Sequence, residues 1–94
     1  MGSLPTKKTV TALVSDPANS QILYASSGDG VFKSLDAGTS WQTMNTGLRE
    51  TQIVALAINP AQPAHLYAAS ASGQIFRSTD GAATWQRQGQ VPTE

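Results

Sequence analysis

The sequence has no cysteine, few charged residues and no long hydrophobic run. Without cysteine the chain can form neither a disulfide framework nor a thiolate metal site. Only 13% of the 94 residues are charged, and six basic residues balance six acidic ones, which argues against a nucleic-acid or anionic-membrane partner. No apolar run approaches the roughly 18 residues of a membrane-spanning helix. What remains is a chain long enough for one small domain that folds by apolar burial.

The motifs of common catalytic and cofactor sites are also missing. There is no G-x-S-x-G elbow, no P-loop and no Rossmann glycine pattern. His65 is the only histidine, and a lone imidazole is better read as a surface or hydrogen-bonded group than as a zinc ligand or base. Asp36 and Asp80 each lie in a turn with one carboxylate, too few oxygens for a calcium ion. We therefore expect no catalytic residue, no metal site and no cofactor, and we expect that the chain is not an enzyme.

One stretch of the sequence occurs twice, and the rest of the chain is organised around it. The stretch is SLDAGTSW from Ser34 to Trp41 and STDGAATW from Ser78 to Trp85. The tripeptide Leu-Tyr-Ala also recurs, 43 residues apart, whereas the later stretch recurs after 44. A repeat of this length matches a four-stranded β-propeller blade, which takes about 40–50 residues. The sequence therefore predicts two blades.

The fold class predicted from this repeat is all-β, with two four-stranded antiparallel blades and no helix. Alternating or β-branched runs between turn residues predict strands at 9–15, 21–26, 31–34 and 41–44, and again at 53–58, 64–70, 75–78 and 85–88. The run 53–58 is apolar on both faces, so we expect it to be buried on both. Residues 1–8 form a lead-in without the pattern of a signal peptide, a cloning-derived start joined to a connector; residues 9–48 form the first blade, and residues 49–94 the second blade with a C-terminal connector.

The repeated stretch has the composition of a tight turn. Its serine and aspartate can bond to nearby backbone groups, its glycine tolerates a positive φ, and its tryptophan returns a large ring toward the core. The pattern resembles the Asp-box, or BNR repeat, known from the β-propellers of sialidases, other glycoside hydrolases, sorting receptors and photosystem assembly factors. Ser40 and Ala82 depart from the family pattern, and Gly81 lies one position early, so the second turn is expected to differ slightly. The resemblance implies a structural role, away from the ligand face, for Ser34, Asp36, Gly38, Trp41, Ser78, Asp80 and Trp85.

Two blades alone leave an apolar face open on each side, and such faces mark association surfaces. Propellers close with about four to eight blades, and identical chains joined head-to-tail can close into a ring. We expect three chains to form a six-bladed propeller, with four chains and eight blades as the second choice. The alternative is that the chain is an excised or engineered piece of a longer propeller.

The resemblance places a ligand at the loops on the opposite end of the blades, where the chain offers Asp29, Asn45, Arg49, Glu50 and Gln74. Asp29 and Glu50 could form a glycosidase carboxylate pair, but solvated loop charges are the simpler interpretation. Arg49, Arg77 and Arg87 do not form a recognisable sialidase set. The first hypothesis is a non-catalytic scaffold or interaction module with a protein ligand. The second is a carbohydrate-binding module lined by Tyr24, Tyr67, Trp41 and Trp85, although these rings are more often core. The third is a fragment of a glycoside hydrolase or of a photosystem-assembly-factor-like propeller. The resemblance favours a soluble protein of the extracellular space or periplasm.

Overall fold

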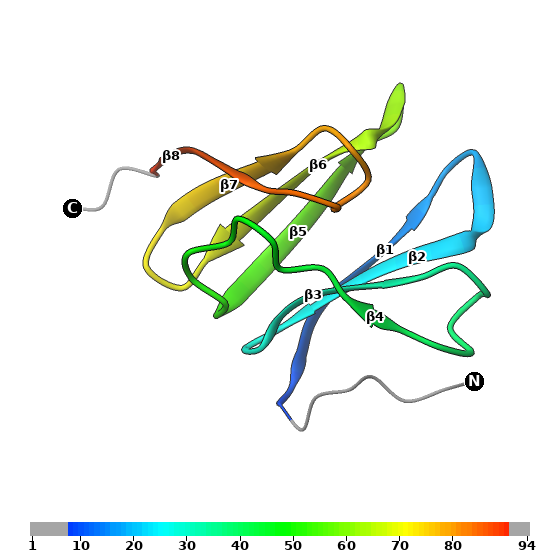
Figure 1. The fold of residues 1–94 in the computed structure, drawn as a ribbon, viewed down its shortest axis with the longest axis horizontal. Helices are drawn as coiled ribbons and strands as arrows, with labels where there is room; N and C mark the ends of the chain where they lie inside the picture. The colour runs from blue at the N-terminus through cyan, green and yellow to red at the C-terminus, as the bar shows by residue number, and fades with distance from the viewer. Residues whose placement is uncertain (1–7, 91–94) are drawn as a thin grey trace.

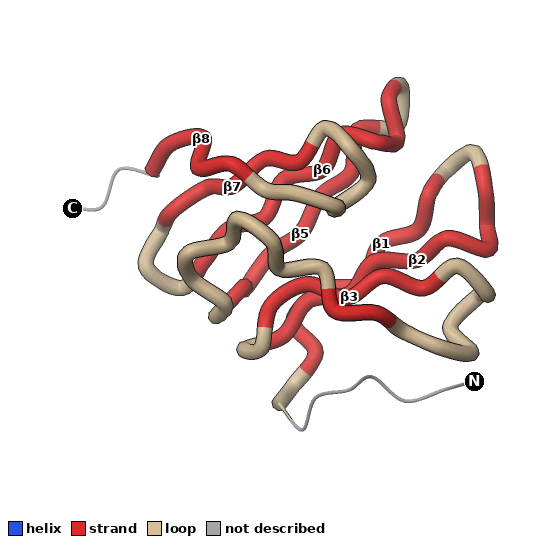
Figure 2. The backbone as a smooth tube through the Cα atoms, in the orientation of Figure 1, coloured by secondary structure: helices blue, strands red, loops and turns tan. Residues whose placement is uncertain are grey.

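The computed structural model describes residues 8–90, which form two four-stranded antiparallel sheets (Figure 1). Each sheet is a meander, in the order β1-β2-β3-β4 and β5-β6-β7-β8. The described part of the chain contains strands, turns and loops, without a helix that could cross a membrane (Figure 2). The strands are β1 (Val10–Asp16), β2 (Asn19–Ser27), β3 (Gly30–Ser34), β4 (Gln42–Thr43), β5 (Ile53–Asn59), β6 (Gln62–Ser70), β7 (Gln74–Ser78) and β8 (Gln86–Gln90). The predicted all-β class with two four-stranded sheets is confirmed.

The strand bounds differ from expectation at the first hairpin of each sheet, at β4 and at β8, which ends two residues later than predicted. The ladder of β1 and β2 continues to the pair Asp16–Asn19, so β2 starts two residues before the predicted position. The Asp16 carboxylate accepts the N–H of Ala18 at 2.8 Å and closes the turn, which explains the longer ladder. β4 is shorter than predicted, because it pairs with β3 only at Gln42 and Thr43. Most of the predicted lead-in and the end of the C-terminal connector, residues 1–7 and 91–94, lie outside the described residues.

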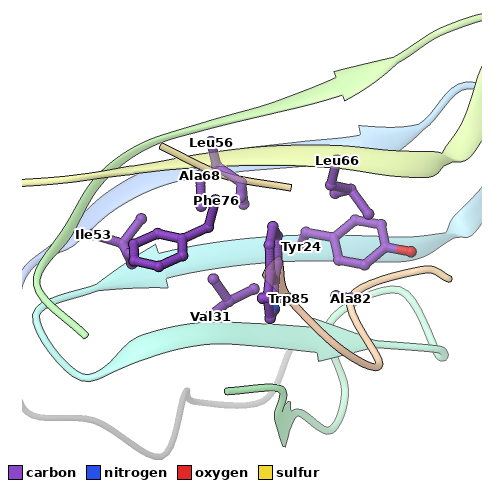
Figure 3. Close-up of a cluster of buried hydrophobic side chains, with 9 residues drawn as sticks. All are labelled: Tyr24, Val31, Ile53, Leu56, Leu66, Ala68, Phe76, Ala82 and Trp85. Atoms are coloured by element: carbon purple, nitrogen blue, oxygen red, sulfur yellow. The ribbon is translucent and has the colours of Figure 1, made fainter. Parts of the chain in front are cut away.

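The core lies between the two sheets. Tyr24 and Val31 of the first sheet meet Leu66, Phe76 and other residues of the second (Figure 3). The cross-strand register explains this set, because directly paired residues share a face. Val14 pairs with Tyr24 and Tyr24 with Lys33, whereas Leu56, Ala68 and Phe76 are paired in the second sheet. One face of each sheet therefore builds the core, and the other face of each points away from it.

The prediction that residues 53–58 are buried on both faces is wrong. Ile53 and Leu56 are buried against the first sheet, but Val54 is 50% exposed and Ala57 is also exposed. The physical reason is that the described chain supplies only one neighbour to this sheet. The far face of β5, although apolar, is left open.

A connector of residues 44–52 ties the two sheets together. Its Thr46 carbonyl accepts the N–H of Trp85 at 2.8 Å, across the interface. Gly47 has φ +91°, and a Cβ at this position would lie 2.1 Å from the Trp85 carbonyl oxygen. At the other side of the interface β1 contacts β5, and the Thr11 hydroxyl donates to the Ile53 carbonyl at 2.7 Å. The sheets are thus joined by polar contacts at both margins of an apolar core.

Candidate functional site

Each repeated stretch folds into a compact polar loop, which we call the first Ser-Asp turn (residues 34–41) and the second Ser-Asp turn (residues 78–85). In the first, the Ser34 hydroxyl donates to Asp36 Oδ1 at 2.8 Å and accepts the N–H of Gly38 at 2.8 Å. Asp36 also accepts the backbone N–H of Ser40 at 2.8 Å and its hydroxyl at 2.6 Å. The serine and aspartate side chains therefore take the place of backbone partners that a loop of this shape cannot supply.

The second turn repeats this network, and the expected alteration is absent. The Ser78 hydroxyl bonds Asp80 at 2.8 Å and the N–H of Ala82 at 2.9 Å, and Thr84 bonds Asp80 through its N–H and hydroxyl. Two consecutive residues are left-handed in each turn, Ala37 and Gly38 in the first, and Gly81 and Ala82 in the second. A glycine at either position relieves strain at one residue only, so moving it does not change the path.

Hydrogen bonding keeps both turn aspartates ionised. The bonds from the Ser40 hydroxyl, the Ser40 N–H and the Ser34 hydroxyl lower the pKa of Asp36 to about 2. The equivalent bonds from Thr84 and Ser78 lower the pKa of Asp80. A carboxylate whose oxygens are occupied and whose pKa is lowered is poorly suited to donate a proton near neutral pH. These groups have the surroundings of structural aspartates.

The tryptophans that end the two turns have different surroundings. Trp85 is 3% exposed in the core between the sheets, and its Nε1–H donates to the Met44 carbonyl at 2.9 Å. Trp41 is half-buried, and its Nε1 is buried without a hydrogen-bond partner among the described residues. The difference follows from position, because Trp85 packs in the core between the two sheets, whereas Trp41 is not part of that core.

Among the loop residues expected at a ligand face, Asn45 supports the backbone and Asp29 forms an ion pair. The side chain of Asn45 accepts the N–H of Val31 at 2.8 Å and donates to the Asp29 carbonyl at 2.9 Å. The Asp29 carboxylate lies 3.4 Å from the Lys8 ammonium in a solvent-exposed ion pair. Asn45 thus holds the loop between β2 and β3 against the connector between the sheets. The sequence did not predict this role, because a polar residue in a connector looks the same in the sequence whether it binds a ligand or supports a loop.

Glu50 forms a second cluster with the loop between β6 and β7. Its carboxylate accepts the hydroxyls of Ser72 and, at 3.3 Å, Ser70. The Ser70 hydroxyl in turn accepts the N–H of Gln74 at 3.2 Å, whereas Arg49 is exposed to solvent. The connector therefore brings Asn45 to the Asp29 loop and Glu50 to the Gln74 loop. Within residues 8–90 no group of three metal-ligating side chains occurs.

The far face of the second sheet carries a shallow apolar groove. Its walls come from three strands, β5, β6 and β7, and its lining is almost entirely apolar. Ala57 pairs with Tyr67, and Tyr67 pairs with Arg77, so their side chains share this face. Arg77 lies 5.9 Å from the centre of the Tyr67 ring and 3.4 Å from His65 Nδ1. The groove is lined by Ala55, Leu56, Ala57, Tyr67, Ala68, Ala69 and Ile75.

Comparisons with known proteins show a propeller fold. No family model matches the chain. A xyloglucanase of Hypocrea jecorina is 29% identical over 80 residues, which are 82% of this chain and 10% of the relative. An ancestral GH74 enzyme superposes with a TM-score of 0.72 at 23% identity, over 85% of this chain and 12% of that one. The Niastella koreensis GH74 enzyme gives 0.68 at 26% identity, over 80% and 13%. The chain spans about a tenth of the length of these proteins, and its two sheets are β-propeller blades.

Proposed function

We propose that this chain is a non-catalytic scaffold module that supplies two β-propeller blades and binds further blades at its two open faces. The observation that carries the proposal is the contrast between equivalent residues. Leu56 is 9% exposed in the core, whereas its repeat equivalent Leu13 is 62% exposed. Tyr24 is 2% exposed, whereas its equivalent Tyr67 is 38% exposed. The same apolar residues are used on covered and on open faces, which supports an interface at each open face.

The two turns fit a structural role within such a module. We propose that they are Asp-box turns, and the same serine and aspartate bonds in both copies support this proposal. The carboxylates of both turns are engaged in these hydrogen bonds. The side chains of Asn45 and Glu50 are likewise hydrogen-bonded to neighbouring loops. None of these groups is held in the arrangement of an acid and a nucleophile facing a common space. The described residues therefore favour a scaffold over a catalyst.

The native mass in solution tests the scaffold proposal. We expect light scattering after size exclusion to give a mass of three chains, or of four, at micromolar concentration. Leu13→Lys places a charge on the open face of the first blade and should reduce the mass to that of one chain. Ala18→Lys, in the exposed turn between β1 and β2, should leave the mass unchanged. A folded wild-type monomer at every concentration would refute the proposal.

A second candidate function is binding of a β-glucan by the assembled ring. It is favoured by the similarity to a protein named xyloglucanase and by the shared fold of two GH74 enzymes. The loops that carry Asp29, Arg49 and Glu50 lie at the end of the blades opposite to the Asp-box turns, and a ring would repeat them around its axis. For such a ligand an extracellular or periplasmic location is the natural one. Calorimetry with xyloglucan oligosaccharides tests the idea, and saturable heat that Glu50→Gln weakens would support it.

Absence of binding to the assembled protein would exclude the glucan role and leave the scaffold role standing. Release of reducing sugar from xyloglucan by the pure protein would instead refute the non-catalytic assignment. Both measurements use the assembled wild-type chain, with Thr79→Ala, in the distant second turn, as the matched control.

A further inference from the structure

Two buried polar atoms within residues 8–90 have no hydrogen-bond partner, and they lie on opposite blades. One is the indole Nε1 of Trp41, and the other is the guanidinium Nε of Arg77. A buried donor without a partner is costly, and few remain unpaired in folded proteins. Residues 8–90 place no acceptor at either atom.

The repeat shows which acceptor the Trp41 indole would meet. Trp41 is equivalent to Trp85, whose Nε1–H crosses the interface between the blades and bonds the Met44 carbonyl at 2.9 Å. Met44 lies one residue after the pair Phe32–Thr43, and Gln88 lies one residue after the equivalent pair Phe76–Arg87. The main-chain carbonyl of Gln88 is thus the equivalent acceptor. Gln88 lies on β8, the edge strand of the second blade.

The same correspondence identifies an acceptor for Arg77. Its equivalent is Lys33, which lies 5.3 Å from the centre of the Tyr24 ring and donates to the Gly81 carbonyl at 3.0 Å across the interface. Arg77 is placed against Tyr67 in the same way, on the open face. Gly81 in the second turn is equivalent to Ala37 in the first. The acceptor equivalent to the Gly81 carbonyl is therefore the carbonyl of Ala37.

The open faces also match each other in their apolar residues. The pairing puts Leu13, Leu23, Ala25 and Phe32 on one face of the first blade, where Leu13 is 62% exposed and Ala25 and Phe32 are buried. The second blade packs the equivalent Leu56, Leu66, Ala68 and Phe76 against the first. On the opposite side of each blade, Tyr24 and Lys33 in the internal interface correspond to Tyr67 and Arg77 on the open face. The chain thus carries both halves of its own internal interface, one on each exposed side. Because its two exposed sides match the two halves of the internal interface, the partner that fits them is a second copy of the chain.

We propose that a second copy docks head-to-tail by repeating the internal interface, which rests on the scaffold function proposed above. The open face of one copy's second blade covers the open face of the next copy's first blade. Trp41 of the next copy donates its Nε1–H to the Gln88 carbonyl, and Arg77 donates to the Ala37 carbonyl in the opposite direction. Trp41 and Arg77 are the positioning residues of this contact, because their donors select one register among the many that apolar faces would permit.

Three variants test the register, with assembly followed by light scattering over a concentration series. Trp41→Phe removes the indole donor, and Arg77→Met removes the guanidinium while retaining an apolar stem. Each should raise the concentration of half-assembly about tenfold or more, because an acceptor is left buried and unpaired. Arg77→Lys should assemble within about threefold of the wild type, because a lysine performs the equivalent task at position 33.

The thermal midpoint of the monomer, measured below the assembly concentration, separates register from folding. Trp41→Phe should not lower it, because the indole N–H has no partner among residues 8–90. If the wild type assembles and both Trp41→Phe and Arg77→Met assemble at the same concentration, the head-to-tail register is wrong and the scaffold function stands. If Arg77→Lys fails as Arg77→Met does, the donor role of Arg77 is wrong. A monomeric wild type would instead overturn the scaffold function itself.

Discussion

Gly47→Ala should weaken the joint between the two blades, because the added methyl group would collide with the backbone of Trp85. A Cβ at this position would lie 2.1 Å from the Trp85 carbonyl oxygen and 3.0 Å from the Trp85 nitrogen. The backbone cannot absorb the methyl in place, because φ at Gly47 is +91°, where an L-residue is strained by about 1–2 kcal/mol. The connector must therefore move away from Trp85.

That movement affects two hydrogen bonds, and the contribution of each to the free energy of unfolding can be estimated. The Trp85 N–H bond to Thr46 at 2.8 Å is lost, and the indole bond to Met44 at 2.9 Å is weakened. Each contributes about 0.5–1.5 kcal/mol net. Together with the backbone strain, the expected loss is about 2–5 kcal/mol. A chain of this length has about 5–14 kcal/mol of total stability, so the variant should lose a large share of it.

Urea unfolding followed by tryptophan fluorescence measures this loss, at a protein concentration where wild type and variants have the same mass. Gly89→Ala is the matched control, because a Cβ there has no atom within 4 Å. We expect the control to stay within about 0.5 kcal/mol of the wild type. If Gly47→Ala is no less stable than Gly89→Ala, the connector does not hold the blades together in the way described.

Three further changes probe the loops. Asn45→Ala should cost about 1–3 kcal/mol in urea unfolding, because it leaves the Val31 N–H and the Asp29 carbonyl unpaired, and equal stability would exclude the supporting role. Ala37→Gly should raise the thermal midpoint by a few degrees, because the exposed Ala37 has φ 59°, and a lower midpoint would contradict the strain argument. The stabilisation from Asp36 is present above its ordinary pKa of 3.8 and is lost as the pH falls toward about 2, so Asp36→Asn should flatten the stability profile in that window. An unchanged profile would show that the Ser40 bonds do not persist in solution.

The spacing of residues along the sequence made the fold predictable. Tyr24 and Trp85 belong to the repeated stretches on which that prediction rested. Strand-forming runs, turn residues and a repeat of blade length indicated two four-stranded sheets, and the tertiary contacts follow the same repeat. The one-sided burial of residues 53–58 could not be predicted from the sequence. An apolar run indicates which residues a strand is able to bury, but it does not indicate whether the chain supplies a second sheet to cover them. Val54 is exposed because the described residues place no second sheet on its face.

The candidate site was harder to predict than the fold. Asn45 and Glu50 were identified as loop polar residues, but their bonds to other loops depend on how the connector crosses both sheet ends. The unpartnered atoms of Trp41 and Arg77 carry no sequence signature, since their equivalents Trp85 and Lys33 are fully engaged. Only the comparison of equivalent positions in three dimensions distinguishes them.

The unequal spacing of the two blades has a geometric consequence. β1 and β5 are in direct contact, whereas the rings of Tyr24 and Trp85 fill the space between the sheets (Figure 3). Two sheets that touch along one edge and are held apart by side chains elsewhere enclose an angle. When each further blade is added at the same angle, the row of blades curves. The number of blades in a closed circle is the number of such angles in one full turn. A narrower side chain at position 85 would flatten the curvature and require more blades for closure.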